Sequence, residues 1–329
     1  MKKFLKNLVP QQFLLWLNKK KRTHELNRIN RYNNQRMLTF SSTFAKDRNA
    51  DIARLMVESH TLEKGITMPG RRMGFGQDRV LSIIANCQTT IKRWGADSVE
   101  VQSALANLKQ YLDIHEGAQF VLPNEITKGI NELLSSLTVD DGNCYLTNKE
   151  EYFRSTKDFA EFAYSRHSVR SFSDKPIDDE TLLKAIHLAQ TAPSACNRQA
   201  TRVKIIDSEK GKELCCKMQR GNRGFGDRAN KWLLITTELG DWSFIHQQEG
   251  FTDGGIFAMN LLYALHYYGI GACTLNALFS PEEREKLRKG LGYPESEEPV
   301  CFIVIGNVDD EFMVCRSHRV DTNTIVQRL

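Results

Sequence analysis

Apolar residues recur every three or four positions between residues 51 and 137, the period at which an α-helix brings side chains onto one face. This pattern predicts an all-helical region, interrupted at residues 65–76 by a loop that contains glycine and proline. The predicted helices have their apolar faces at Ile52–Leu62, Val80–Ile91 and Val101–Leu112, and a fourth helix runs from Pro123 toward Leu137.

After Lys149 the pattern changes to helices that alternate with short, apolar, β-branched runs, which are typical of buried strands. The predicted strands are Val203–Ile206, Leu233–Thr237 and Phe302–Ile305, and the predicted helices span residues 178–188, 253–268 and 281–290. Ser280, Pro281 and Glu283 form a capping box with proline at the first helical position, which places the start of the last helix. The second half of the chain is therefore an α/β or α+β domain.

Turn-forming residues between these two patterns mark a boundary, since residues 140–143 read Asp-Asp-Gly-Asn. We expect three parts: a basic N-terminal arm at residues 1–48, a helical region at 49–149 and the mixed domain at 150–329.

Charge is distributed unevenly over the 329 residues, whose net charge is +5. Residues 1–36 hold ten Lys or Arg and one acid, Glu25, a net charge of +9 that leaves −4 for the rest. Apolar residues such as Phe13 and Trp16 are mixed with lysines in this arm, a composition that suits contact with an anionic membrane surface through residues 1–22. A disordered or partner-docking tail is the alternative. No recognised nucleic-acid-binding module is present, so no nucleic acid is expected.

Several classes of protein are excluded. No apolar run approaches the roughly 18 residues of a membrane-spanning helix, and Phe13–Leu17 is too short for the core of a signal peptide. The eight cysteines form no C-x-x-C pair and no zinc-ligand spacing. We therefore expect a cytoplasmic protein without a metal site.

Four segments could carry chemistry. Residues 165–172 read Ser-Arg-His-Ser-Val-Arg-Ser-Phe, in which two arginines with hydroxyls between them suit a phosphate, because guanidinium groups bind it through paired hydrogen bonds. A solvated helix end is the alternative. The other three are a polar connection at 193–199 (Pro-Ser-Ala-Cys-Asn-Arg-Gln), a run of small residues at 269–278 and a basic segment at 315–319.

Together these segments, in this order and spacing, resemble the FMN-dependent nitroreductase family across about residues 152–329. The helix segment Gly-Gly-Ile-Phe-Ala-Met-Asn-Leu-Leu at 254–262 belongs to the same resemblance. It implies an α+β fold with a central mixed β-sheet flanked by helices, here preceded by the all-helical N-terminal region.

The resemblance also implies the residues that would hold FMN. Arg166, Ser168 and the adjacent His167 match the phosphate and ribityl contacts, and Arg170 matches the basic group near flavin N1. The segment along the pyrimidine edge corresponds to Ser194, Asn197 and Gln199. The pair near flavin N5 corresponds to Asn276 and Ala277, and the C-terminal phosphate clamp to Ser317 and Arg319.

This sequence departs from the family pattern at residues 226–229, which read Gly-Asp-Arg-Ala where many members have an asparagine and a lysine. Arg228 is the residue that could replace this lysine. Ser317 also stands where some members have a lysine.

The activity implied by the resemblance is a flavin oxidoreductase that takes electrons from NADH or NADPH. It would pass hydride through flavin N5 to a small electron-poor acceptor, such as a nitro compound or a quinone, in a ping-pong cycle. In this cycle no protein side chain is required as the catalytic group, because the flavin carries the chemistry. The family is homodimeric, with the flavin at the interface. The alternatives are a flavin-binding sensor or accessory protein without turnover, and a different flavin reaction on the same scaffold.

One further pair lies in the helical region. His60 and Glu63 are three residues apart on a predicted helix and could act as an acid/base pair, although an exposed surface pair is the simpler interpretation.

Overall fold

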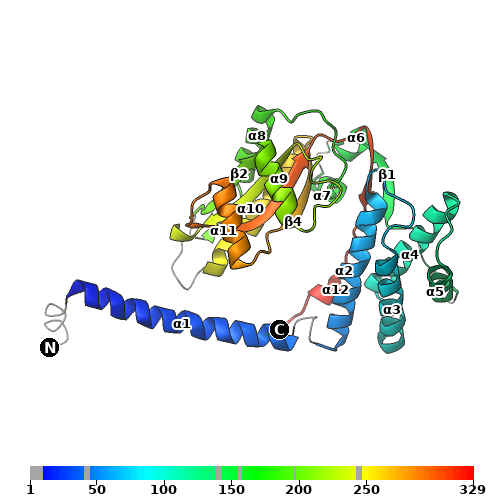
Figure 1. Ribbon diagram of the computed structural model, residues 1–329, viewed down its shortest axis with the longest axis horizontal. Coiled ribbons are helices and arrows are strands. Elements are labelled where there is room, and N and C mark those ends of the chain that lie inside the picture. The colour runs from blue at the N-terminus through cyan, green and yellow to red at the C-terminus, as the bar shows by residue number, and fades with distance from the viewer. Residues whose placement is uncertain are drawn as a thin grey trace.

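The computed structural model describes residues 10–329, apart from 41–44, 136, 138, 140–141, 155–157, 196–197 and 242–246. Figure 1 shows a long helix at the N-terminal end, a group of helices, and a sheet covered by helices.

The basic arm forms a helix, α1 (Gln11–Phe40), which extends away from the rest of the described chain in Figure 1. The sequence pattern did not predict this helix, because α1 has no continuous apolar face. Its many lysines, arginines and glutamines are nevertheless good helix formers. A continuous apolar run, Phe13–Leu17, lies in its first two turns, where Trp16 is 47% exposed and stacks on Phe13. Contact with a membrane surface stays a prediction. None of the described helices is long and apolar enough to span a membrane.

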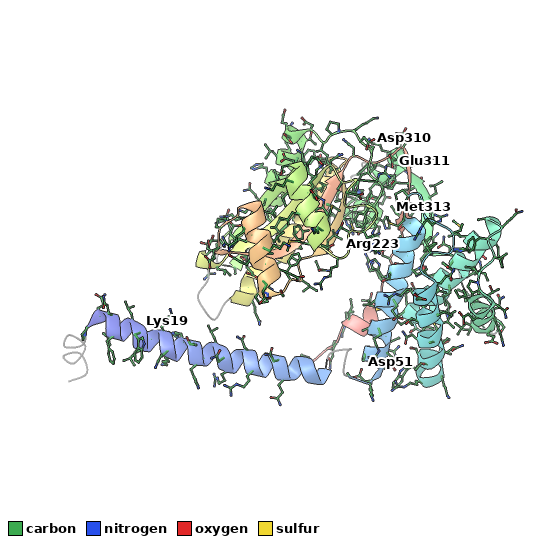
Figure 2. The ribbon with its side chains drawn as sticks, in the orientation of Figure 1. Lys19, Asp51, Arg223, Asp310, Glu311 and Met313 are labelled. Carbon is green, nitrogen blue, oxygen red and sulfur yellow. The ribbon has the colours of Figure 1, made fainter. Side chains whose placement is uncertain are left out.

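The predicted all-helical region is confirmed as four packed helices. These are α2 (Arg48–Thr67), α3 (Gln77–Trp94), α4 (Val99–Gly117) and α5 (Asn124–Leu134). Their predicted apolar faces meet in one core that includes Leu55, Ile83 and Leu105, all fully buried. A polar contact also fixes α2 to α3, since Asp51 accepts hydrogen bonds from Arg93 (2.5 Å) and Trp94 (2.9 Å); Figure 2 labels Asp51 near the start of α2.

A four-stranded sheet forms the centre of the second half, with strand order β2-β3-β5-β4. The strands are β2 (Thr201–Ile206), β3 (Lys231–Glu238), β4 (Gly271–Asn276) and β5 (Glu297–Gly306). The α+β class and the helices flanking the sheet are confirmed. All three strand pairings are antiparallel, however, so the expected mixed sheet is wrong for the described strands. Short apolar runs do not reveal strand direction, because buried parallel and antiparallel strands have the same composition.

Helices cover both faces of this sheet. On one face lie α8 (Asp179–Ala189) and α10 (Gln247–Tyr267), and on the other α9 (Glu209–Met218) and α11 (Pro281–Leu291). Alternate residues of β3 point to opposite faces, so Trp232 packs with α9 and α11 while Leu233 packs with α8 and α10. The predicted capping box is confirmed at the start of α11.

A second, two-stranded sheet joins the helical region to the mixed domain. It pairs β1 (Cys144–Asn148) with β6 (Glu311–Cys315) in antiparallel register, and Cys144 lies opposite Cys315. Both cysteines are buried in the core of helices α2 to α5. The short elements α6 (Lys149–Tyr152), α7 (Phe159–Ser165), η3 (Leu239–Asp241) and α12 (Thr322–Ile325) complete the described chain.

Candidate functional site

The arginine-rich segment leaves the end of α7 and runs beside β4. Arg166 is the C-terminal cap of α7 and has an extended backbone. The backbone N–H of Val169 donates to the carbonyl of Ala272 at 2.9 Å, and Val169 and Phe172 are fully buried. The apolar residues of the segment therefore hold it against the sheet, which places the arginines beside β4.

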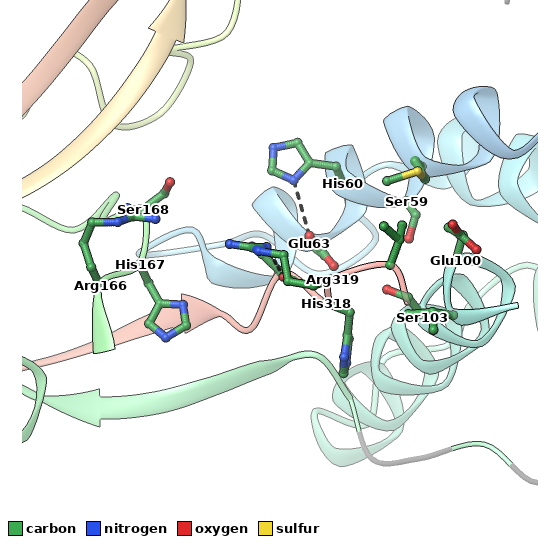
Figure 3. A pocket seen from close by; sticks show the side chains of 14 residues that line it. Ser59, His60, Glu63, Glu100, Ser103, Arg166, His167, Ser168, His318 and Arg319 are labelled. Atoms are coloured by element: carbon green, nitrogen blue, oxygen red, sulfur yellow. Dashed lines mark hydrogen bonds and ion pairs between the residues drawn. The ribbon is translucent and has the colours of Figure 1, made fainter. Parts of the chain in front are cut away.

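A first cavity of about 400 Å³ opens at this segment. Two chain segments and two helices line it, as Figure 3 shows. Its lining includes Arg166, His167, Ser168, Ser317 and Arg319 from the mixed domain, with Met56, His60 and Glu63 from α2 and Glu100 from α4. The Nε atom of Arg166 is buried and has no hydrogen-bond partner among the described residues. An arginine in this condition is suited to an anion that enters the cavity.

A second cavity of about 410 Å³ lies farther along α2. It is lined by Arg170, Asn276, Cys273 and Gly221 from the mixed domain, and by Met56, His60 and Lys64 from α2. No carboxylate is among the described residues that line it. Because Met56 and His60 line both cavities, the two adjoin, and we call them together the α2 cleft.

Arg170 is buried at the second cavity. Its Nη1 donates to the Sγ of Cys315 at 3.9 Å, and the guanidinium group lies 5.9 Å from the ring centroid of Phe225. Its Nε, like that of Arg166, has no hydrogen-bond partner among the described residues. Each of these buried Nε atoms can therefore donate a hydrogen bond to a ligand, although the charge of Arg170 also lowers the pKa of the nearby Glu63 carboxyl.

His167 lines the first cavity, but its polar groups are already used by the protein. Its Nε2 lies 3.1 Å from the hydroxyl of Tyr145, its backbone N–H donates to the Tyr152 hydroxyl, and its carbonyl accepts from that hydroxyl at 2.6 Å. Burial lowers the pKa of His167, and the positive charge of Arg166 lowers it further. A hydrogen bond with the Cys315 backbone acts in the opposite direction but does not outweigh them. These hydrogen bonds to Tyr145 and Tyr152 hold the arginine segment in place.

The C-terminal segment closes the first cavity from the other side. Ser317 has a left-handed backbone (φ 51°), and its carbonyl accepts a hydrogen bond from the Arg319 guanidinium group. This turn brings Ser317 and Arg319 to the cavity that Arg166 lines, and their role as a phosphate clamp stays a prediction.

Asn276 lies at the end of β4 and lines the second cavity. Its carbonyl accepts from Gln219 Nε2 (3.2 Å), and its Oδ1 accepts from the backbone N–H of Leu278 (3.2 Å). Ala277 follows it and is buried in the core of the sheet domain. These contacts fix the backbone at the point where β4 leaves the sheet.

The segment at 193–199 lies elsewhere in this chain. Ser194 and Gln199 line a third cavity of about 320 Å³ together with Asp253 and Phe257, and neither lines the α2 cleft. Ser194 Oγ accepts from the backbone N–H of Gln199 at 3.0 Å. Asn197 lies outside the described residues. Within one chain, therefore, the structure does not bring Ser194 and Gln199 to Arg166.

Arg228, the residue that could replace the family's lysine, lies outside the α2 cleft in the described structure. Its Nη2 donates to the carbonyl of Phe172 at 3.2 Å, and it lines neither cavity of the α2 cleft. Gly226 in the same loop packs closely, since a Cβ there would lie 2.8 Å from the Trp232 ring. Gly226 and Arg228 therefore pack against the sheet domain and do not line the cleft.

Sequence reasoning did not place the residues of α2 at the site, nor Glu100 of α4. Met56, His60 and Lys64 follow one another at intervals of four, so they share one face of the helix, and that face forms a wall of the cleft. The pairing of His60 with Glu63 was visible in the sequence, but nothing local indicated that α2 lies against residues 166–170.

A family model described as the Nitroreductase family matches residues 163–233 and 211–307. An Archaeoglobus fulgidus protein, named as a candidate NADH dehydrogenase/NAD(P)H nitroreductase, is 27% identical over an alignment of 170 positions that covers 47% of this chain and 94% of that protein. The iodotyrosine deiodinase of Haliscomenobacter hydrossis is 24% identical over an alignment of 206 positions, which covers 54% of this chain and 91% of that protein. A solved candidate nitroreductase of Desulfovibrio desulfuricans in complex with FMN is 17% identical, with a TM-score of 0.46, covering 53% of this chain and 98% of that one.

Proposed function

We propose that this chain, whose residues 163–307 match the model of the nitroreductase family, is an FMN-dependent oxidoreductase that uses NADH or NADPH to reduce a small electron-poor acceptor. The α2 cleft is the proposed site. Nitro compounds and quinones are the acceptors that we propose, since both accept electron pairs readily.

The observation that carries the proposal is the pair of arginines with buried, unpartnered Nε atoms, Arg166 and Arg170, one at each cavity of the cleft. A cofactor with a phosphate at one end and a ring that becomes anionic at the other would satisfy both. FMN has these two ends, so the residues present fit it.

In this arrangement Arg166, Ser168, Ser317 and Arg319 would hold the phosphate through charge-assisted hydrogen bonds. Arg170 would stabilise negative charge on the ring, and its burial strengthens this effect because the local dielectric constant is low. When bound, FMN supplies the two-electron chemistry. The protein binds, orients and shields it.

We also propose that two copies of the chain form the working unit, with the flavin at the interface. Ser194 and Gln199 lie at a separate cavity within one chain. In a dimer, these residues of one copy could instead contact the flavin in the α2 cleft of the other copy. The family resemblance supports this dimer.

The proposed function is tested by the visible spectrum of the purified protein under anaerobic conditions. We expect a yellow protein, or a colourless one that becomes yellow with FMN, and we expect NADH or NADPH to bleach it. Protein that does not take up FMN contradicts the proposal. Protein that binds FMN but is bleached by neither nicotinamide supports the flavin-binding accessory protein instead.

A further inference from the structure

One face of helix α2 packs in the helical core, and another face lines the cleft. Leu55, Leu62 and Ile66 are buried in the core that it shares with α3 and α4. Met56 and His60 face the cleft, and Figure 3 shows the His60 ring on the same side of α2 as Ser168 and Arg166.

The position of α2 is fixed by contacts with the mixed domain. Lys64 Nζ donates to the carbonyl of Gly221 at 2.8 Å, and the Sγ of Cys315 lies 3.8 Å from the hydroxyl of Thr67. Because these contacts lie at the C-terminal half of α2, they hold His60 at the cleft.

His60 is oriented by a carboxylate. Its Nδ1 lies 3.3 Å from Oε2 of Glu63, whose other oxygen accepts a hydrogen bond from Asn107 at 3.1 Å. The Glu63 side chain is 7% exposed, whereas that of His60 is 51% exposed. The carboxylate is therefore inside the protein, and the imidazole reaches from it into the cleft.

Glu63 remains charged in this position. Burial alone would raise its pKa, but hydrogen bonds with His60 and Asn107 and the positive charge of Arg170 outweigh burial, so the pKa lies below its usual value. A buried carboxylate that accepts the Nδ1–H of a histidine fixes the ring orientation and leaves Nε2 to exchange protons. No hydrogen-bond partner of Nε2 lies among the described residues.

We propose that His60, positioned by Glu63, donates a proton to the oxygen of the acceptor in the α2 cleft. This inference rests on the proposed function. A quinone that receives a hydride, which is two electrons and one proton, becomes a hydroquinone anion. The His60 Nε2–H bond then breaks, a bond from that proton to the anion's oxygen forms, and the neutral imidazole recovers its proton from water.

The lining of the second cavity fits an acceptor of this class. Lys64 adds a second cation beside the Arg170 proposed to face the flavin ring, and no carboxylate lines the cavity among the described residues. Negative charge that develops on the oxygen of an acceptor stacked on that ring is therefore favoured there. Met56 and Leu275 supply apolar surface for a planar ring. The acceptor class is therefore a small quinone or nitro compound.

The kinetic test compares two acceptors in the FMN-loaded protein. Duroquinone takes up protons when it is reduced, whereas ferricyanide takes up electrons only. We expect His60→Ala to lower kcat with duroquinone by about 100-fold, the usual size of a general acid's contribution. We expect its rate with ferricyanide to stay within about twofold, because no proton is transferred to ferricyanide.

The matched control is His187→Ala, which removes an exposed histidine of α8 that lines neither cavity of the cleft. It should leave both rates unchanged. Equal losses with the two acceptors in His60→Ala would show a merely structural role and overturn the proposal, as would an unchanged duroquinone rate.

A second test does not depend on turnover. In protein labelled with ¹⁵N-histidine, the neutral His60 ring should carry its proton on Nδ1, and Glu63→Gln should shift it toward Nε2. A neutral ring already protonated on Nε2 in the unsubstituted protein would contradict the role of Glu63. Failure of this inference is distinct from failure of the proposed function, since the latter appears as absent FMN uptake or absent bleaching in the unsubstituted protein.

Discussion

Replacing Arg166 with alanine should leave the purified protein with little bound FMN. Hydrogen bonds to a charged group contribute about 1.5–3 kcal/mol each, so the loss of this guanidinium group should raise the Kd for FMN by about 10- to 150-fold. The effect is expected to be large because Arg166 is partly buried and its Nε has no other partner among the described residues. Fluorescence quenching of FMN during titration measures the change.

The matched control is Arg72→Ala, which removes an exposed arginine from the loop between α2 and α3. Arg72 lines neither cavity of the α2 cleft, so FMN affinity should stay within about twofold. Riboflavin, which has no phosphate, provides a second control, because Arg166→Ala should hardly change its binding. Equal FMN affinity in Arg166→Ala and the unsubstituted protein would remove Arg166 from the phosphate site.

The largest loss of stability is expected from Trp232→Ala. Trp232 is fully buried on β3, its ring contacts Phe302 edge-on at 5.6 Å, and its Nε1 donates to the carbonyl of Gly226 at 3.0 Å. Removing a buried aromatic side chain costs about 3–5 kcal/mol in the free energy of unfolding. Loss of the hydrogen bond also frees the Gly226 loop. Urea denaturation followed by circular dichroism measures the difference.

Trp232→Phe separates the two contributions, since phenylalanine keeps most of the ring and removes the N–H donor. This variant should lose about 1–3 kcal/mol, the cost of leaving a buried carbonyl without its partner. A loss below about 1 kcal/mol in Trp232→Ala would contradict the packing described for this face of the sheet.

Much of the fold could be predicted because its signals are local. The apolar period at Val80–Ile91 predicts α3, and the capping box at Ser280 marks the start of α11, which the structure confirms. The strands β1 and β6 were not predicted, because each has only five residues and its partner lies more than 160 residues away in the sequence. Pairing at such a separation leaves no local pattern. β4 was overlooked because its small residues suggested a loop.

The candidate site was predictable only in part. Arg166 and Ser168 stand in a segment whose residue types suit a phosphate, and the structure places them at one cavity with Ser317 and Arg319. The contribution of α2 could not be predicted, because it depends on how the helical region packs against the β1–β6 pair. The sequence indicated only that His60 could pair with Glu63 on a helix surface. That His60 lines the α2 cleft follows from the folded structure alone.

The most direct test of the central claim is a crystal structure of the protein with FMN. The account predicts the FMN phosphate against Arg166, Ser168 and Arg319 in the first cavity, and the ring beside Arg170 and Asn276 under α2 in the second. Phosphate density at any other place, such as the separate cavity of Ser194 and Gln199, would contradict it.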